Sequence, residues 1–267
     1  MNPSKIRPAA VAGMFYPDDP EDLRHMVSRF LQDAHHVVDE KPAKPRAIIA
    51  PHAGYIYSGP VAASAYSYVE SMKDSINNVV LIGPSHRVPL IGLATSNADY
   101  FATPLGNVPI NRTITGTINE LPFVTALDQA HAMEHSLEVH LPFLQMTLHE
   151  FSLVPIVAGD ASPDQVNQLI EVACKADDTL LVISSDLSHY HDYETAKRMD
   201  QDTCQAIETL DIRGIDSHHA CGYIPVRGLL NYAKQHHLHA TTVDCRNSGD
   251  TAGPRDQVVG YGSYVFT

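Results

Sequence analysis

The sequence predicts an α/β fold: a single-domain sandwich over residues 1–267, with a largely parallel central sheet flanked by helices. Two observations predict this class. Four short, almost continuously apolar segments are typical of parallel strands that are buried on both faces. Helical patterns separate these segments, and such an alternation builds a parallel sheet. The chain has 267 residues and is 44% hydrophobic, which is enough for one large core.

The predicted elements follow one another closely along the chain. Asp18 or Asp19 followed by Pro20 is a typical helix start, and so is Ser162 followed by Pro163. The expected strands are 46–50, 78–82, 153–158 and 179–184, and the expected helices are 20–36, 59–72, 136–148, 162–176 and 193–210.

Two parts of the chain depart from this alternation. Segments 239–250 and 258–266 alternate more between polar and apolar residues, and they predict strands that pair antiparallel at an edge of the sheet. Residues 90–111 indicate an irregular β insertion. The sequence leaves the topology of residues 90–125 open.

Composition argues against several classes of function. The 31 acidic and 18 basic side chains give a net charge of -13, which opposes binding to a nucleic-acid backbone. No apolar run approaches the roughly 20 residues that span a bilayer, so no membrane association is expected. The first residues lack the apolar region of a secretory signal, which predicts a cytoplasmic protein. The four cysteines are widely spaced and are expected to be free thiols.

Residues whose side chains can bind metals lie directly after the predicted strands. His52 follows the first strand and His86 the second; Asp186 and His189 follow the fourth, and the segment "ATTVDCRNSGD" supplies Cys245. In open α/β sheets, ligands bind in the crevice outside the carboxyl ends of the strands. We therefore expect these side chains to converge on one metal site. Imidazole and thiolate suit zinc, copper or iron, and a three-ligand site leaves positions for water or substrate.

Each of these residues has a simpler explanation when it is taken alone. A single histidine at a strand end more often makes a structural hydrogen bond, and a single cysteine is most often a small buried hydrophobe. The metal prediction therefore depends on the joint pattern.

A second group of candidate ligands lies in "AHAMEHSLEVHLPFL". His135 and Glu138 are three residues apart and share one helix face, whereas His140 points elsewhere. Pro142 is expected to end or kink this helix. A His-x-x-Glu pair binds metal in some helical bundles, but the second half of such a site is missing here. We therefore interpret His135, Glu138 and His140 as residues that line the crevice from one flank.

Seven segments form an ordered set of motifs along the chain: "PAAVAGMFYP", "IIAPHAGYIYSG", "LIGPSHRVP", "EHSLEVHLPFL", "VISSDLSHY", "CGYIPV" and "CRNSGD". In this order they resemble the blocks of the Memo family, from about Arg7 to the C-terminus. That family includes the eukaryotic mediator of ErbB-driven cell motility and prokaryotic relatives named AmmeMemoRadiSam system protein B. The resemblance implies a fold similar to that of the class III extradiol dioxygenases, whose metal is held by two histidines and a carboxylate.

The resemblance also implies roles for individual residues. It makes His52 and His86 the two histidine ligands and places Cys245 where the dioxygenases have their carboxylate. Asp186 and His189 would stand beside the metal, where the dioxygenases keep an acid/base histidine. A thiolate in place of the carboxylate favours copper(I), zinc or iron and adds an oxidisable ligand, which argues against simple oxygen-dependent ring cleavage.

Two functions of different classes remain open. The first is a metal-dependent, dioxygenase-like oxidoreductase for a small substrate, in which Asp186 orients His189 for proton transfer and Tyr55 stacks on a ring. The second is a non-catalytic metal-handling or peptide-binding protein; eukaryotic Memo proteins are described as binding copper or iron and phosphotyrosine peptides. A phosphopeptide requires arginines, and the crevice turns offer only Arg87 and Arg246. The metal, the ligand and the oligomeric state are left open.

Overall fold

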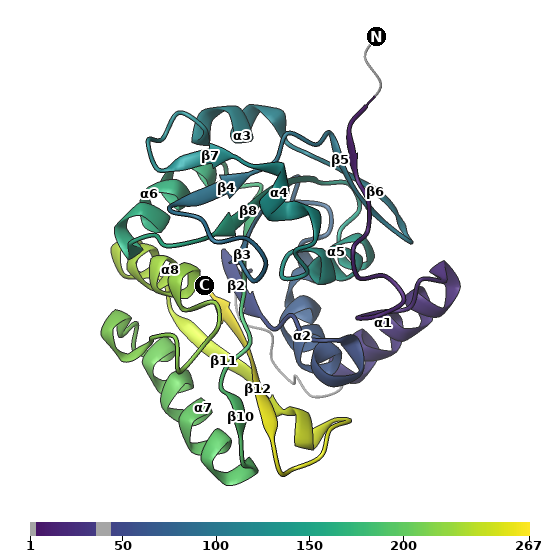
Figure 1. Cartoon of the computed structure of the whole chain (residues 1–267), viewed down its shortest axis with the longest axis vertical. Helices are drawn as coiled ribbons and strands as arrows, with labels where there is room; N and C mark the ends of the chain where they lie inside the picture. The colour runs from purple at the N-terminus through teal and green to yellow at the C-terminus, as the bar shows by residue number, and fades with distance from the viewer. Residues whose placement is uncertain (1–3, 36–43) are drawn as a thin grey trace.

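A nine-stranded sheet forms the centre of the molecule (Figure 1). The computed structural model describes residues 4–35 and 44–267. Neighbouring strands follow the order β10-β12-β2-β9-β3-β8-β4-β7, and β11 also pairs with β12. The strands are β2 (Ala47–Ala50), β3 (Asn78–Pro84), β4 (Leu93–Thr95), β7 (Val124–Ala126), β8 (Ser152–Ala158), β9 (Thr179–Ser184), β10 (His189–His191), β11 (Ala240–Asn247) and β12 (Val258–Phe266).

The central strands β2, β9, β3 and β8 run parallel to one another, as the sequence predicts. Every residue of β2 and β9 is buried, which explains their continuous apolar sequences. Antiparallel strands complete the sheet on both sides. β12 pairs with β2 and with β11 in this orientation, which confirms the predicted pairing of the two C-terminal segments.

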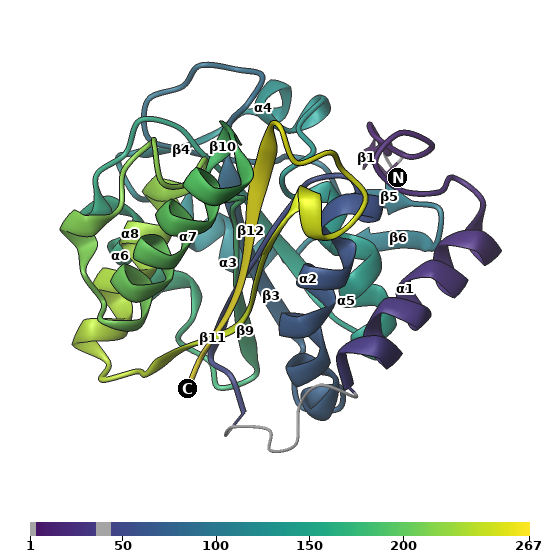
Figure 2. The ribbon, with the colours of Figure 1, turned by 90° about the horizontal axis from the view of Figure 1, so that it is seen from below.

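Helices cover both faces of the sheet, with α6, α7 and α8 on one side and α1, α2 and α5 on the other (Figure 2). Each layer encloses its own core. Ile48 packs in the core beneath α1 and α2, whereas the next residue, Ile49, packs in the core beneath α6 and α8. The helices are α1 (Pro20–His35), α2 (Tyr55–Val69), α3 (Arg112–Ile118), α4 (Asp128–Ala132), α5 (Leu141–Thr147), α6 (Pro163–Ala173), α7 (Tyr193–Glu208) and α8 (Tyr223–Gln235). The predicted end of the first helix, at residue 36, lies outside the described residues. Within the described parts of the chain, no helix has the length and apolar character that a bilayer crossing requires.

Residues 90–125, whose topology the sequence leaves open, contribute to two sheets. β4 and β7 extend the main sheet. β5 (Tyr100–Thr103) and β6 (Gly106–Pro109) instead join β1 (Ile6–Arg7) in a separate three-stranded sheet. The N-terminal strand is thereby attached to the middle of the chain.

Several helical regions differ from those predicted, and neither α3 nor α4 was expected from the sequence. Segment 136–148 divides into a 3₁₀ turn, η2 (Glu138–His140), and the helix α5. Pro142 lies in the first turn of α5, where its missing N–H breaks no helical hydrogen bond, so it begins this helix instead of ending one. No helix was predicted where α8 lies, because Pro225 and Gly228 weaken its helical pattern.

The carboxyl ends of β2, β9 and β3 lie side by side at one edge of the sheet, because β9 is inserted between the other two. The chain leaves these strands at Ala50, Ser184 and Pro84. The segments that follow all three strands therefore enter the same space.

Candidate metal centre

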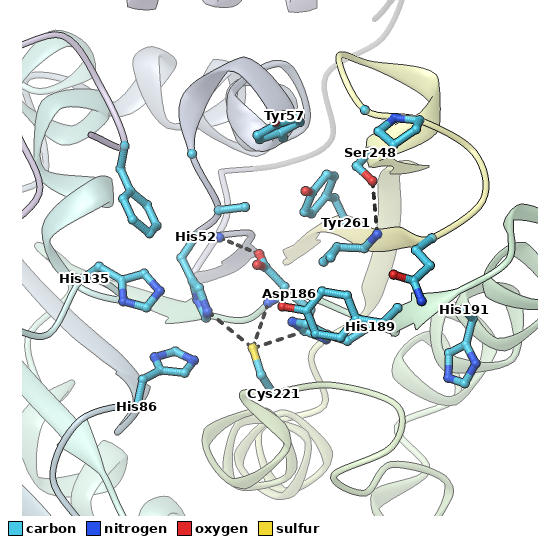
Figure 3. A pocket seen from close by; sticks show the side chains of 18 of the residues that line it. His52, Tyr57, His86, His135, Asp186, His189, His191, Cys221, Ser248 and Tyr261 are labelled. Atoms are coloured by element: carbon cyan, nitrogen blue, oxygen red, sulfur yellow. Dashed lines mark hydrogen bonds between the residues drawn. The ribbon is translucent and has the colours of Figure 1, made fainter. Parts of the chain in front are cut away.

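A cavity of about 840 Å³ opens at this edge of the sheet (Figure 3). The segments after β2 and β3 bring His52 and His86 to its wall, and the segment after β9 brings Asp186 and His189. Its size is within the usual range for a small-molecule site. Further rings complete the wall: Phe15, Tyr57, His135, Tyr190, His191, His218 and Tyr261.

Three imidazoles meet in this cavity. His52, His86 and His135 each offer one ring nitrogen, and the three nitrogens lie within 4.8 Å of one another. The rings of His52 and His86 meet edge to face with centroids 5.1 Å apart, and those of His86 and His135 stack at 4.6 Å. Such a cluster has the ligand type and spacing for one metal ion.

Ser184, the last residue of β9, determines which nitrogen of His52 is free. Its hydroxyl donates to the carbonyl oxygen of Ser136 over 2.6 Å, because a carbonyl can only accept. The same oxygen lies 2.6 Å from Nδ1 of His52, and with its own proton engaged it accepts from that nitrogen. Burial keeps the pKa of His52 well below its ordinary value, so the ring is neutral. The lone pair of His52 is therefore on Nε2.

Glu134 has the same effect on His86. Its carboxylate accepts from Nδ1 of His86 over 2.8 Å and also from the backbone amides of His86, His135 and Ser136. Burial alone would raise the pKa of Glu134, but the hydrogen bonds from the ring and the backbone N–H of His86 and from the backbone N–H of Ser136 outweigh it and lower the pKa to about 2. The ionised carboxylate holds the proton of His86 on Nδ1 and leaves its lone pair on Nε2.

Cys221 brings a thiol to the same place. Its Sγ lies 3.3 Å from Nε2 of His52, and the backbone N–H of Asp186 donates to it over 3.3 Å (Figure 3). The next residue, Gly222, packs so closely that a Cβ there would stand 2.5 Å from the carbonyl oxygen of Ser184. Glycine therefore allows the cysteine to reach the strand ends. Burial raises the pKa of this thiol, and a metal ion would lower it by binding the thiolate.

Asp186 and His189 line the cavity, but their hydrogen bonds differ from those predicted. Asp186 accepts from the backbone N–H of His52 over 2.7 Å, and Nδ1 of His189 donates to the carbonyl oxygen of Leu187 over 2.8 Å. Leu187, and not Asp186, thus orients His189 and leaves its Nε2 able to accept a proton. Burial raises the pKa of Asp186 to about 6, against the opposing effects of the His52 amide and the nearby imidazoles.

Cys245 lies elsewhere, which corrects its placement as the third ligand. It is within β11, opposite Gly262 of β12, and lines a separate small pocket beside α7. β11 continues to Asn247, so the residue that follows this strand and lines the large cavity is Ser248. In the structure, His135 and Cys221 accompany His52 and His86.

Glu138, predicted to line the crevice, instead binds the N-terminal segment. It accepts from the hydroxyl of Tyr16 over 2.6 Å and from the backbone amides of Ala10 and Val11, and it pairs with Arg7. The tight η2 turn directs this side chain away from the cavity and into the protein interior.

Three more of the predicted crevice residues lie outside the cavity. The hydroxyl of Tyr55 donates to the carbonyl oxygen of Val139 over 2.6 Å, and Nδ1 of His140 lies 3.0 Å from the hydroxyl of Tyr66. Arg246 lines a different groove, between α1, α2 and β11. Of the five residues predicted to line the crevice, only His135 does so.

Glu134, Ser184 and Cys221 were not predicted from the sequence as residues of the site. Each carried a weak signal. Glu134 directly precedes His135, Ser184 ends a buried strand beside two more polar residues, and Cys221 begins the "CGYIPV" motif. None of these signals shows that the three residues contact the two strand-end histidines.

Comparison with known proteins tests the family resemblance that the seven motifs indicate. The sequence profile of the family described as Memo-like protein matches residues 7–265. The chain belongs to the Memo-like family. A MEMO1 family protein of Aquifex aeolicus is 37% identical over 276 residues, which cover 98% of this chain and 99% of the relative. A MEMO1 family protein of Thermoplasma acidophilum is 35% identical over 269 residues, covering 97% of this chain and 98% of the relative.

Proposed function

We propose that this Memo-like protein holds a transition metal between His52, His86 and His135, with the thiol of Cys221 beside His52 as a further ligand, and acts as a metal-dependent oxidoreductase on a small molecule. One observation carries the proposal. The hydrogen bonds of Ser184 and Glu134 leave the lone pairs of both strand-end histidines on Nε2. Protein residues that orient imidazoles in this way are typical of metal centres.

The donor atoms favour particular metals. Imidazole nitrogens and a thiolate suit iron, copper or zinc, whereas calcium and magnesium prefer oxygen ligands. His52 is neutral, so its lone pair is available at neutral pH without loss of a proton. When bound, the ion would supply redox or Lewis-acid chemistry to a substrate in the cavity.

His189 and Asp186 are the candidate proton-transfer groups. Nε2 of His189 carries a lone pair, since Nδ1 donates to Leu187, and the ring lines the cavity beside the proposed ligands. It can accept a proton from a substrate hydroxyl within hydrogen-bond reach. A carboxyl group with a pKa of about 6, such as Asp186, can exchange protons near neutral pH.

The cavity wall favours a small aromatic or otherwise planar substrate. Phe15, Tyr57, Tyr190 and Tyr261 present rings to the cavity. None of the described residues that line it is Lys or Arg, and Arg246 faces another groove. A phosphopeptide site requires such cations, so the peptide-binding alternative has less support.

Metal analysis of protein purified without oxygen and without a metal-affinity column tests the proposal. We expect about one ion of iron, copper or zinc per chain. Metal-loaded protein is then screened for turnover of catechols and other small phenols under oxygen. The His189→Ala variant should retain metal affinity within about tenfold but lose about 100-fold in turnover.

Two results would contradict parts of this proposal. Failure to bind any of the three metals would exclude the metal centre itself. Stoichiometric metal without turnover of any candidate would favour the non-catalytic, metal-handling alternative, especially if ligand binding survives the His189→Ala change. His149→Ala, at an exposed residue that does not line the cavity, is the matched control.

A further inference from the structure

Two thiols meet outside the metal pocket, between α7 and β11. Cys204 of α7 lies 3.1 Å from the hydroxyl of Tyr264, which packs against Gly262, and Cys245 of β11 is directly opposite Gly262. The two thiols are therefore neighbours, and their side chains interact. Both cysteines are free; Cys245 is exposed and Cys204 is half-buried. A pair of adjacent free thiols with access to solvent is the arrangement that oxidants can convert to a disulfide.

An irregularity in β11 turns Cys245 toward α7. Thr242 pairs with Tyr264, but the register then shifts by one residue, so that Cys245 pairs with Gly262. In a regular strand, residues 242 and 245 would point to opposite faces, and the extra residue places them on the same face. Both side chains therefore lie on the face of β11 that α7, the helix of Cys204, covers.

The neighbouring strand, β12, brings a third polar group, the hydroxyl of Tyr264, to the two thiols. The hydroxyl of Tyr264 lies 3.1 Å from Sγ of Cys204. A Cβ at Gly262, directly opposite Cys245, would stand 2.3 Å from this hydroxyl. The absence of a side chain at Gly262 therefore allows the tyrosine to contact Cys204.

We propose that Cys204 and Cys245 are a peroxide-sensitive dithiol that closes to an intramolecular disulfide between α7 and β11. In the first step, the thiolate of Cys204 attacks one oxygen of hydrogen peroxide. The O–O bond breaks, one oxygen stays on sulfur as a sulfenic acid, and the other leaves as water. In the second step, the thiolate of Cys245 attacks that sulfur, the S–S bond forms, and the S–O bond breaks to release a second water. The two thiols lose two electrons and two protons, and the peroxide gains them.

The surroundings of the two sulfurs assign their roles. The neighbouring thiol of Cys245, and then the hydroxyl of Tyr264, lower the pKa of Cys204 by hydrogen bonding despite its partial burial. The pKa of Cys245 is raised, chiefly by its hydrogen bond to Cys204. Because the hydroxyl of Tyr264 can donate to its thiolate, Cys204 is the attacking thiol, and the exposed Cys245 resolves the sulfenic acid.

The disulfide would involve the helix that supports the segment carrying His189. One turn before Cys204 on α7, Asp200 accepts from the backbone N–H of Ser188 over 3.0 Å. Ser188 directly precedes His189. Oxidation would thus attach the helix that supports this part of the cavity to β11, although the thiol chemistry itself does not depend on a bound metal.

Peptide mapping under non-reducing conditions tests this proposal. Reduced full-length protein is treated with hydrogen peroxide, blocked by alkylation and digested. The expected product is a peptide pair joined through Cys204 and Cys245, about 2 Da lighter than the sum of the free peptides and separated again by dithiothreitol. The wild-type measurement does not depend on the folding of any variant.

Single substitutions assign the two roles. Cys245→Ser should accumulate a sulfenic acid at Cys204 that a 1,3-dione reagent traps, whereas Cys204→Ser should form neither the disulfide nor the trapped adduct. Tyr264→Phe should form the same disulfide about threefold or more slowly. Cys174→Ser, which changes a thiol packed elsewhere beside α6, should behave like the wild type.

The opposite results are equally specific. The proposal is wrong if peroxide oxidises Cys204 to sulfinic acid in the wild type without forming the link. It is also wrong if the main disulfide joins either thiol to Cys174, to Cys221 or to a second chain.

Discussion

Two groups of buried histidines differ in what their ring nitrogens contact. His52 in the pocket and His131 and His140 in the core are all 2% exposed or less. At His131, Nε2 donates to the carbonyl oxygen of Ala94 over 3.1 Å, and among the described residues Nδ1 has no hydrogen-bond partner. At His140, Nδ1 contacts Tyr66, and Nε2 likewise has no partner in the described structure. In the pocket, by contrast, the free nitrogen of His52 lies beside other candidate ligands.

The difference shows that burial alone does not distinguish the candidate metal site. Burial lowers the pKa of His131 to about 4 and that of His140 to about 3, so both rings are neutral, as is His52. Neutral imidazoles are thus common in this protein. Convergence distinguishes the pocket, and it results from strands β2, β9 and β3 ending side by side.

The strongest test of this comparison removes one imidazole from each group. His52→Ala or His86→Ala should lower metal affinity by more than about 100-fold, because each removes a proposed ligand and such a loss should exceed that of a supporting residue. His131→Asn should leave metal affinity within about twofold, since it lies outside the cluster. Titration with iron(II), copper(I) and zinc measures both, and circular dichroism checks the fold. Equal losses of metal affinity in the pocket and core variants would contradict the distinction between the two groups of histidines.

The cysteines offer the same comparison with a smaller expected effect. Cys221→Ser should weaken metal binding by about 10- to 100-fold, because a hydroxyl is a much poorer ligand for these metals than a thiolate. Cys245→Ser should change it by less than about twofold, because that thiol faces α7. The same titrations apply to both variants. A larger loss for Cys245→Ser would restore the ligand set predicted from the sequence.

Residues that hold the histidines in place should have a smaller effect again. Glu134→Gln should weaken metal binding by about tenfold, because the neutral amide no longer fixes the proton of His86 on Nδ1. Tyr66→Phe is the matched control, since it removes the partner of His140 in the core. It should leave metal affinity unchanged while lowering the free energy of unfolding. Competition with a chelator of known affinity gives both affinities.

The core histidines should make the free energy of unfolding depend on pH. The unfolded chain protonates His131 near its ordinary pKa of 6.5, whereas the folded protein does so only near 4. The free energy of unfolding of the metal-free protein should therefore fall as the pH falls from about 6.5 to about 4. Urea unfolding should show that His131→Asn flattens this slope by about 1 kcal/mol per pH unit between about pH 6 and 5.

Two further points separate this effect from others. Asp186, with its pKa raised to about 6, contributes stability that is lost as the pH rises between about 4 and 6. This opposite slope is present in both proteins and cancels in their difference. His149→Asn, at an exposed residue, should leave the slope unchanged. Parallel slopes for the wild type and His131→Asn would contradict the assignment.

The sequence allowed much of the fold and part of the site to be predicted. Continuous apolar segments located β2, β3, β8 and β9, and parallel strands necessarily bring residues such as His52 and His86 to one edge. Side-chain direction was harder to predict. Cys245 follows an apolar segment, but β11 continues two residues beyond it, and its register shift turns the thiol toward α7. Cys221 reaches the cavity only because Gly222 packs against β9, a long-range contact with no local pattern.

The order of the strands also affects when the pocket can exist during biosynthesis. β9 lies between β2 and β3, although both precede it in the chain by about 100 residues or more, and Cys221 follows later still. An N-terminal fragment that ends before β9 has neither Ser184 to orient His52 nor the thiol. On the ribosome, a growing chain therefore offers no complete ligand set until most of it has been synthesised. A metal held by the proposed ligands would thus be inserted only into chains that are nearly finished, and we expect prematurely terminated chains to remain without it.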